Sequence, residues 1–447
     1  MLIRFSVSNF CSFKEEAELS MIPSKERSHK DQVYKTKSKN TSSLLRGAVV
    51  YGSNASGKSN LVKAISYAKN LIIRGKAPNK KLDLPHFKLD QSSSKSPTRF
   101  EFEIQCNNKM YAYGFELFNS HVYEEWLYLV KSKEDQLIFE RKNENSEDIY
   151  DFGESLKKLS DEDFQLFNFV AKGTRPNQLF LSETIDRNLD NFSEVYNWFD
   201  RTLKIISPNS KANGIEFKIS EDSTFKDYLT KVLDLADTGI KEIRTEEISL
   251  SNLGGIPPLL IERLQEDLDE DEGALIADPD SGKRIVIRKL DGELCAYKLS
   301  TSHRCSDDSH DISFDLEEES DGTRRLIELT PALYEMAHSN ESSVHIIDEI
   351  DRSLHPHLTR LLVREHLESE KNSQSQLIVT THETSLLDVS LIRRDEIWFI
   401  QKDESGVSKL YSLNNFQPRY DKDIRKDYLL GRYGAIPFVG DFRRLNR

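Results

Sequence analysis

The segment Gly52 to Ser59 reads GSNASGKS and fits the pattern GxxxxGK[ST] of a phosphate-binding loop. The apolar run GAVVYG leads into it, as a buried strand would, and apolar residues at helical spacing follow. In such a loop, backbone N–H groups surround phosphate oxygens at the start of a helix. We therefore expect Lys58 to bridge the β- and γ-phosphates of a nucleotide and Ser59 to bind Mg²⁺. The residues expected to contact the nucleotide are Gly52, Ser53, Asn54, Ala55, Ser56, Gly57, Lys58, Ser59 and Asn60.

A second apolar run, VHIIDE (Val344 to Glu349), ends in two carboxylates. A carboxylate at the end of a buried strand can hold Mg²⁺, and we expect Asp348 to do so. Glu349 is one residue further along and should point to the other face of a strand. We expect it to be the general base that polarises the attacking water. The alternative is a strand that ends in two exposed acids, which the loop at Gly52 makes the weaker interpretation.

Two more motifs complete an ordered series. LIVTTHE predicts a third buried strand, whose terminal His382 is expected to hydrogen-bond a γ-phosphate and help to place the water. EEESDGTRRLIEL predicts an acidic lead-in to an amphipathic helix. The residues at the corner of that helix are Ser320, Gly322 and Thr323. A lone histidine is commonly structural, and Ser320 could be a simple N-cap. The functional interpretation of these residues therefore depends on the order of the motifs.

The elements that must position these residues are predicted in three segments. Residues 1–145 combine period-2 strand patterns with the phosphate loop, which indicates antiparallel strands beside it. Residues 146–305 show helix patterns, an acidic run and one hairpin, KRIVIRKLDGELCAYKL, that turns at Asp-Gly. Residues 306–447 alternate helices with apolar strands, as in a parallel sheet covered by helices. Pro331 is expected to kink or split the helix after Ser320.

The composition argues against several classes of protein. A chain of 447 residues, 37% hydrophobic and 31% charged, can form two or three units with sizeable cores. No apolar stretch approaches the roughly 18–20 residues that span a bilayer, and the first residues lack the apolar core of a signal peptide. The four cysteines show no CxxC spacing, so we expect a cytoplasmic protein without a membrane partner. The net charge of −13 argues against a surface covered by nucleic acid, although a local basic face could bind it.

The order of phosphate loop, Ser-Asp-Gly-Thr, Asp-Glu and Thr-His resembles that of the ABC-type ATPase heads of the SMC and DNA-repair class. The opening FSVSNFCSF is also similar to the first strand pair of that class. The resemblance implies the fold class: α/β, an ABC-ATPase-like P-loop NTPase head with a mixed sheet flanked by helices, an antiparallel β subdomain and a mostly helical insertion. It also implies ATP and Mg²⁺ as ligands, ATP hydrolysis, His382 as a switch histidine, and Asp351 in EIDRSLHP as the D-loop aspartate.

The resemblance further implies that the Ser320 corner acts in trans. In this class a signature motif, Ser-x-Gly-[Gln/Thr], reaches the γ-phosphate held by the facing subunit. ATP would thus join two copies of the chain into a homodimer or a higher oligomer. Asp321 and Thr323 stand where transporters usually carry Gly and Gln, which disfavours a transporter subunit. No Asn-Lys-x-Asp motif supports a GTPase.

Several segments are more closely similar to one bacterial group, the overcoming-lysogenization-defect-like "AAA family" ATPases of abortive-infection and anti-phage loci. That group includes the ATPase subunits of Septu, PARIS and abortive-infection L-type systems. The similar segments are EESDGTRRLIEL, IIDEIDRSLHPHL, LIVTTHETSLLD, DEIWFIQKDESGVSKLYSL and GRYGAIPF. The resemblance implies a sensor or scaffold subunit that controls a partner effector from the same operon, expected to be a nuclease. The alternative is a DNA-repair or recombination ATPase of the SMC class that acts directly on DNA.

Overall fold

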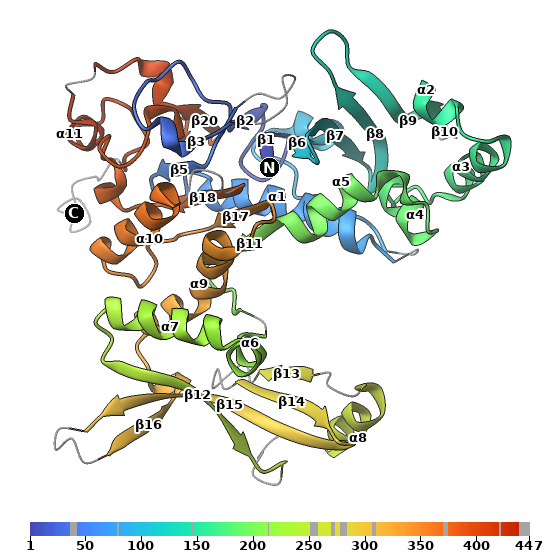
Figure 1. Cartoon of the computed structure of the whole chain (residues 1–447). Helices are drawn as coiled ribbons and strands as arrows, with labels where there is room; N and C mark the ends of the chain where they lie inside the picture. Colours follow the sequence, from blue (N-terminus) through green and yellow to red (C-terminus); the bar gives the residue numbers. More distant parts are fainter. Residues whose placement is uncertain are drawn as a thin grey trace, which may run out of the picture. The chain divides into compact units, whose positions relative to one another are not determined.

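The computed structural model divides into two compact units, whose helices and strands are labelled in Figure 1. Unit 1 comprises Met1–Pro208, Asn340–Asp351 and Arg360–Arg447, and unit 2 comprises Asn209–Ser339 and Arg352–Thr359. The expected segment 146–305 is shared between them, because its residues up to Pro208 fold with unit 1. The residues that the structure describes are 1–35, 43–77, 80–144, 147–212, 214–250, 258–269, 273–277, 284–305, 310–369, 374–419 and 422–437.

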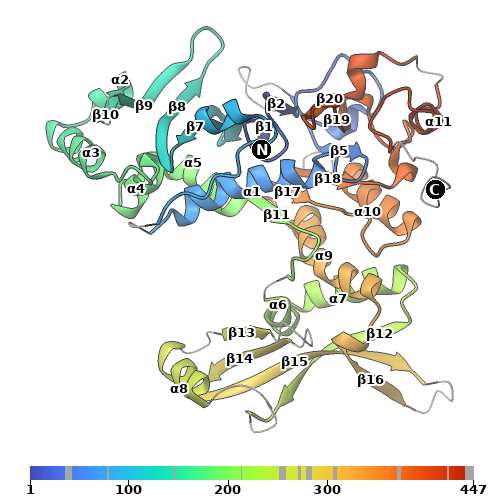
Figure 2. The same cartoon turned by 180° about the vertical axis from the view of Figure 1, so that it is seen from behind.

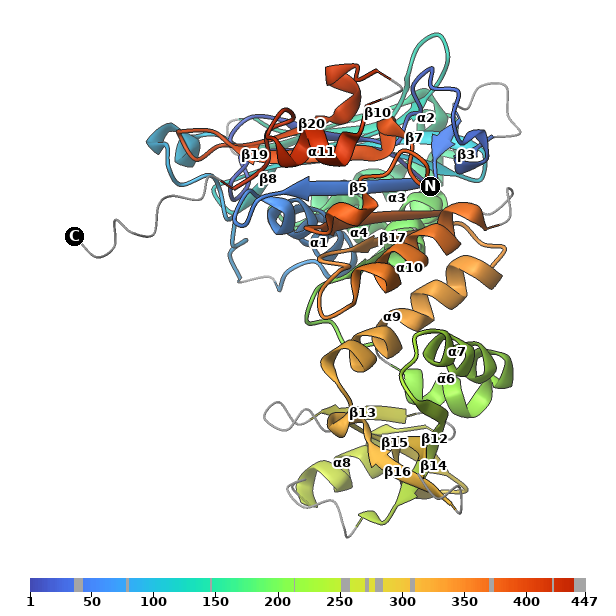
Figure 3. The same cartoon turned by 90° about the vertical axis from the view of Figure 1, so that its left-hand side faces the viewer.

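The strand before the phosphate loop lies inside a six-stranded sheet of unit 1. In order, the strands are β11 (Leu203–Ile206), β17 (Ser343–Ile347), β18 (Ser375–Thr381), β5 (Gly47–Gly52), β19 (Ile397–Lys402) and β20 (Ser408–Ser412). The first five are parallel and β20 is antiparallel. The alternation of helices and apolar strands predicted parallel strands at β17, β18 and β19, whereas β11 was not predicted. Every residue of β5, β17 and β18 is buried, which explains their near-continuous apolar runs. Figure 3 shows β20, β5 and β17 in this order.

Helices cover both faces of this sheet. They are α1 (Lys58–Arg74), α11 (Ile424–Leu429) and α10 (Pro356–Glu368). In α10, the residues from Arg360 on belong to unit 1. Val50 shares a core with the apolar face of α1. The alternate residues of β5 face the other side. There a Cβ added at Gly47 would lie 2.8 Å from Leu367, and the Tyr51 ring lies 5.9 Å from that of Tyr428.

A seven-stranded antiparallel sheet forms the second half of unit 1. Its strands, in order, are β10 (Glu147–Phe152), β9 (Gln136–Glu144), β8 (His121–Val130), β7 (Lys109–Phe118), β6 (Thr98–Cys106), β1 (Leu2–Ser8) and β2 (Ala17–Ser20). The period-2 patterns predicted β1, β2, β6, β7 and β8, whereas β9 and β10 were not predicted. The turns at Asn107-Asn108 and Asn119-Ser120 have positive φ, as tight hairpins require. One hydrophobic core joins this sheet to α1 and to the six-stranded sheet.

Short helices follow β10 and complete unit 1. They are α2 (Glu154–Lys157), α3 (Asp161–Gly173), α4 (Phe180–Asp186), α5 (Ser193–Asn197) and a π-helical turn at Trp198–Thr202. The aromatic residues of α3 and α4 pack on β9 and β10, and those of the π-helical turn pack on β6 and β7. Figure 2 shows α2, α3 and α4 beside β9 and β10. The ring centroids of Phe139 and Phe180 are 5.0 Å apart, and those of Phe167 and Phe192 are 5.7 Å apart.

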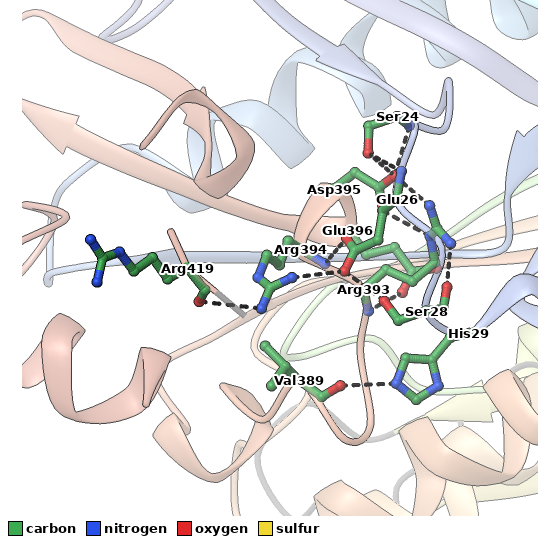
Figure 4. A network of polar contacts seen from close by, with 10 residues as sticks. All are labelled: Ser24, Glu26, Ser28, His29, Val389, Arg393, Arg394, Asp395, Glu396 and Arg419. Atoms are coloured by element: carbon green, nitrogen blue, oxygen red, sulfur yellow. Dashed lines mark hydrogen bonds and ion pairs between the residues drawn. The ribbon is translucent and has the colours of Figure 1, made fainter. Parts of the chain in front are cut away.

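A buried network of charges holds the segment before β19. Arg393 donates to Asp395 at 2.9 and 2.7 Å and to the carbonyl oxygen of Ser28 at 2.6 Å (Figure 4). Arg394 pairs with Glu26 at 3.2 Å. These side chains are all less than a tenth exposed, so each charge depends on its partner. The network ties the chain after β2 to the strand that neighbours β5. A short ribbon, β3 (Val33–Tyr34) and β4 (Leu44–Leu45), lies in the same part of the sequence.

Unit 2 combines helices with an antiparallel sheet. The helices are α6 (Ile215–Glu221), α7 (Ser223–Leu235), α8 (Pro258–Asp267) and α9 (Asp321–His338). The strands are β12 (Ile240–Ile248), β15 (Glu293–Arg304), β14 (Arg284–Leu290), β13 (Gly273–Ala277) and β16 (Asp311–Asp315). The predicted hairpin joins β14 to β15 at Asp291-Gly292. The sequence did not predict β12, because IKEIRTEEI is mostly charged and its strand is partly exposed.

Helix α9 runs through Pro331 as one helix, so the proline does not split it. Proline removes one backbone hydrogen bond from a helix. Here the hydroxyl of Thr330 donates to the carbonyl oxygen of Leu326 at 2.8 Å, next to the interruption. Leu326, Leu329 and Leu333 are buried on both sides of the proline. Burial of each leucine is worth about 1.5–3 kcal/mol, which together exceeds the cost of the proline, about 3 kcal/mol.

Candidate nucleotide-binding site

The phosphate loop between β5 and α1 is in close contact with two neighbouring strands. Gly57, at the N-cap of α1, has a φ of 121°, and Ala55 has a φ of 61°. A Cβ added at Gly57 would lie 2.5 Å from Oγ of Ser408 in β20. A Cβ added at Gly52 would lie 2.6 Å from the carbonyl oxygen of Ile400 in β19. Both glycines are therefore required by the approach of β19 and β20, and Gly57 also by its backbone conformation.

Lys58 is buried, and its ammonium group lies within the loop. Its Nζ donates to the carbonyl oxygens of Gly52 at 2.8 Å and Ser53 at 3.2 Å, and it lies 2.9 Å from Nε2 of His382. Burial lowers the pKa of Lys58 to about 8, and nearby carboxylates oppose this effect. Burial, followed by the charge of Lys58, also lowers the pKa of His382. The lowered pKa of His382 favours a neutral imidazole, whose Nε2 can accept a hydrogen bond from the Lys58 ammonium.

The two carboxylates follow Ile347, the last residue of β17. Asp348 is buried, and its Oδ1 accepts a hydrogen bond from Oγ1 of Thr380 at 2.5 Å. Glu349 is partly exposed and has a φ of 50°, a left-handed conformation. Strand alternation, which led us to expect the two carboxylates on opposite faces, therefore does not extend to Glu349. Its direction is set by the turn after β17 instead.

Asp351 connects the segment after β17 to the end of β18. Its Oδ1 accepts a hydrogen bond from Oγ1 of Thr381 at 2.7 Å, and its Oδ2 accepts one from the backbone amide of His382 at 3.4 Å. The same carboxylate also acts electrostatically on Lys58 and His382. Asp351 therefore holds the backbone of the residue that contacts Lys58.

Ser59 and Asp348 offer a hydroxyl and a carboxylate, which are the hard oxygen donors that Mg²⁺ prefers. A nucleotide-bound Mg²⁺ takes few ligands from the protein, because phosphate and water oxygens supply the others. The donor set fits an ion of this kind. Within the described ranges, no group of three or more His, Cys, Asp or Glu side chains could hold a metal ion.

The predicted signature residues lie in unit 2, at the start of α9. Oγ of Ser320 accepts a hydrogen bond from the amide of Thr323 at 3.1 Å, so Ser320 does act as an N-cap. A Cβ added at Gly322 would lie 2.7 Å from the carbonyl oxygen of Ser353, whose φ is 60°. Residue 322 must therefore be glycine if the loop after Asp351 is to keep this position.

Glu319, just before the corner, is bound to the sheet of unit 2. It accepts a hydrogen bond from Thr301 of β15, and one of its oxygens lies 2.7 Å from Nε2 of His303. The side chain is 8% exposed. It thus links β15 to the first residues of α9.

Unit 1 brings together the loop and the ends of β17 and β18, with Lys58, Asp348, Glu349, Asp351 and His382. Ser320, Gly322 and Thr323 form a separate corner in unit 2. Ser12 and Ser408, which support the loop, were not predicted from the sequence. Asn60 donates to Ser12 at 2.8 Å, and Ser408 donates to the carbonyl oxygen of Ser56. The hydroxyl of Thr380, which donates to Asp348, did have a signal in the sequence, because Thr380 lies two residues before His382 in LIVTTHE.

The loop is glycine-rich and follows a buried parallel strand, β5. Carboxylates follow β17, and polar residues lie at the end of β18, the strand between β17 and β5. These features define a P-loop NTPase of the α/β class. The chain belongs to the family described as "AAA domain, putative AbiEii toxin, Type IV TA system", whose profile matches residues 48–388. A comparison with curated proteins found no match.

Two solved structures cover almost the whole chain at low similarity. The SMC head domain from Thermotoga maritima is 13% identical, with a TM-score of 0.38, over 92% of this chain and 98% of that one. A structure of the SmcHead bound to the C-winged helix domain of ScpA is 12% identical, with a TM-score of 0.40, over 93% and 99%. Among the residues described, no helix has the length and apolar character needed to cross a membrane.

Proposed function

We propose that this protein binds ATP with Mg²⁺ and hydrolyses it, and that two copies share each nucleotide as ABC-type ATPases do. The observation that carries the proposal is the arrangement in unit 1. The buried ammonium of Lys58, the neutral His382 and the carboxylates after β17 meet at the start of α1. Positive charge, oxygen donors and a candidate base at a loop of this kind favour phosphate chemistry.

In the proposed reaction, the loop amides and Lys58 hold the β- and γ-phosphates. Mg²⁺ bound by Ser59 and Asp348 would neutralise the charge that develops on the phosphate oxygens. Glu349 takes a proton from water as the water oxygen attacks the γ-phosphorus. The bond from that phosphorus to the β–γ bridging oxygen breaks and releases ADP and phosphate. In this proposal His382 releases Lys58 to the phosphates and, with a proton on Nε2, donates a hydrogen bond to a γ-phosphate oxygen.

The Ser320 corner completes the site from the second subunit in this proposal. The start of α9 offers a hydroxyl and backbone N–H groups, which suit an anion. Asp321, the first residue of the helix, is exposed and pairs with Arg324. ATP would then join the subunits, and loss of the γ-phosphate would loosen them.

Two substitutions test the assignment of roles. Lys58→Ala is expected to abolish nucleotide binding, because the phosphates lose their buried cation. Glu349→Gln is expected to bind ATP and remain assembled without hydrolysis, because the amide cannot accept the proton. Equilibrium binding of a fluorescent ATP analogue and phosphate release measure the two steps. Hydrolysis by Glu349→Gln at the parental rate would show that Glu349 is not the base.

We further propose that the ATPase is a cytoplasmic sensor or scaffold of an anti-phage, abortive-infection system and controls a partner effector, expected to be a nuclease. The family description, which names a toxin of a toxin–antitoxin system, and the similarity of the signature, D-loop and switch segments support this role. Co-purification with proteins encoded in the same operon, in both nucleotide states, is the test. Absence of any such complex would contradict the role. DNA-stimulated ATP hydrolysis would instead favour the direct DNA-repair function.

A further inference from the structure

One buried side chain in β18, that of Thr380, contacts both residues at the catalytic end of β17. Thr380 is 1% exposed. Its Oγ1 donates a hydrogen bond to Oδ1 of Asp348 at 2.5 Å and accepts one from the amide of Glu349 at 2.8 Å. Its carbonyl oxygen accepts a third bond from the amide of Ile350 at 3.1 Å. A single residue thus binds three consecutive residues after β17.

These bonds lie where the backbone leaves the strand. The φ of 50° at Glu349 is left-handed, a conformation that is unfavourable for a residue other than glycine. An amide that is buried there without a hydrogen-bond partner would add a second cost. The bond from the Glu349 amide to Thr380 removes the second cost and so favours the turned conformation. The direction of the Glu349 side chain depends on that conformation.

We infer that Thr380 is a positioning residue for ATP hydrolysis, whose hydroxyl holds the Asp348 carboxylate and the Glu349 backbone in one fixed arrangement. The inference rests on the proposed function. The same oxygen must donate to one group and accept from another, which a hydroxyl can do. Serine retains this capacity, whereas valine keeps the shape of threonine without it. A displacement of about 1 Å in a catalytic group can reduce the rate about 100-fold.

The test compares Thr380→Val and Thr380→Ser with the parental protein and with Thr330→Val. Thr330 is a matched control because it is also fully buried, and its hydroxyl bonds to the carbonyl oxygen of Leu326 in α9 instead. Thr380→Val is expected to lower kcat about 10- to 100-fold, with the Kd of a fluorescent ATP analogue changed less than about threefold. Thr380→Ser should stay within about threefold of the parental kcat, and Thr330→Val should change neither value.

Each other outcome is informative. A folded Thr380→Val protein with the parental kcat would overturn the inference. The proposed function would stand in that case, because the parental protein hydrolyses ATP. Equal losses in the Val and Ser variants, or a kcat loss matched by loss of affinity and of thermal stability, would assign Thr380 a structural role and also overturn it. A parental protein that hydrolyses no ATP would contradict the proposed function and the inference with it.

Discussion

At the scale of single residues, Lys58 and His382 form the most informative pair in the molecule. Two loop carbonyl oxygens and an imidazole nitrogen lie within hydrogen-bond distance of the ammonium. An incoming phosphate would compete with these three acceptors for the hydrogen bonds of Lys58. Burial makes the ammonium easier to deprotonate, because the charged form loses hydration. The charge that phosphate binding requires is therefore sensitive to pH in the mildly alkaline range.

This sensitivity predicts how nucleotide affinity depends on pH. Lys58 is charged below its pKa of about 8 and neutral above it, so binding above pH 8 must include uptake of a proton. We expect the Kd for ATP to be nearly constant from pH 6.5 to 7.5 and to rise about tenfold from pH 8.5 to 9.5. Fluorescence titration of the parental protein with a non-hydrolysable fluorescent ATP analogue measures this, because Glu349 contributes to the pKa of Lys58 and must be retained. Circular dichroism at each pH serves as the control for unfolding, and an unchanged Kd at pH 9.5 in folded protein would contradict the role of Lys58.

At the scale of elements, the start of α9 is attached to its surroundings on two sides. Glu319 binds β15 through Thr301 and His303, and Gly322 packs against the carbonyl oxygen of Ser353. The sheet of unit 2 and the loop after Asp351 are thus both in direct contact with the proposed signature. A change in either element would therefore act directly on residues that lie within two positions of Ser320.

The contact at Gly322 leads to a prediction with a matched control. A Cβ at residue 322 would meet the Ser353 carbonyl oxygen, whereas a Cβ at Gly173, in α3, meets nothing within 4 Å. Gly322→Ala should therefore displace the loop and lower ATP hydrolysis at least about tenfold, with ATP binding by each subunit retained. Gly173→Ala should leave both unchanged. Parental hydrolysis by Gly322→Ala would mean that this packing does not matter for the site.

At the scale of the whole molecule, the sequence predicted the parallel sheet, the loop and the strand ends, because buried parallel strands and Gly-rich loops have specific patterns. It did not predict β12, whose charged residues hide its alternation, or the turn at Glu349, which a hydrogen bond to Thr380 stabilises. Ser12 and Ser408 are ordinary serines in the sequence and gain a role only through long-range pairing. Local patterns therefore identified the chemical groups, and tertiary contacts identified what holds them.

The central claim is that each ATP site takes its base from one subunit and its signature from the other. Mixing two inactive variants, Ser320→Arg and Glu349→Gln, tests this directly. Each alone should bind ATP without hydrolysing it. In a mixed dimer, the Ser320→Arg subunit keeps its loop and Glu349, and the Glu349→Gln subunit supplies an intact signature. Random pairing in a two-fold dimer should restore about a quarter of the parental hydrolysis rate in an equal mixture. A mixture as inactive as its components, or a Ser320→Arg protein with the parental rate, would contradict the account.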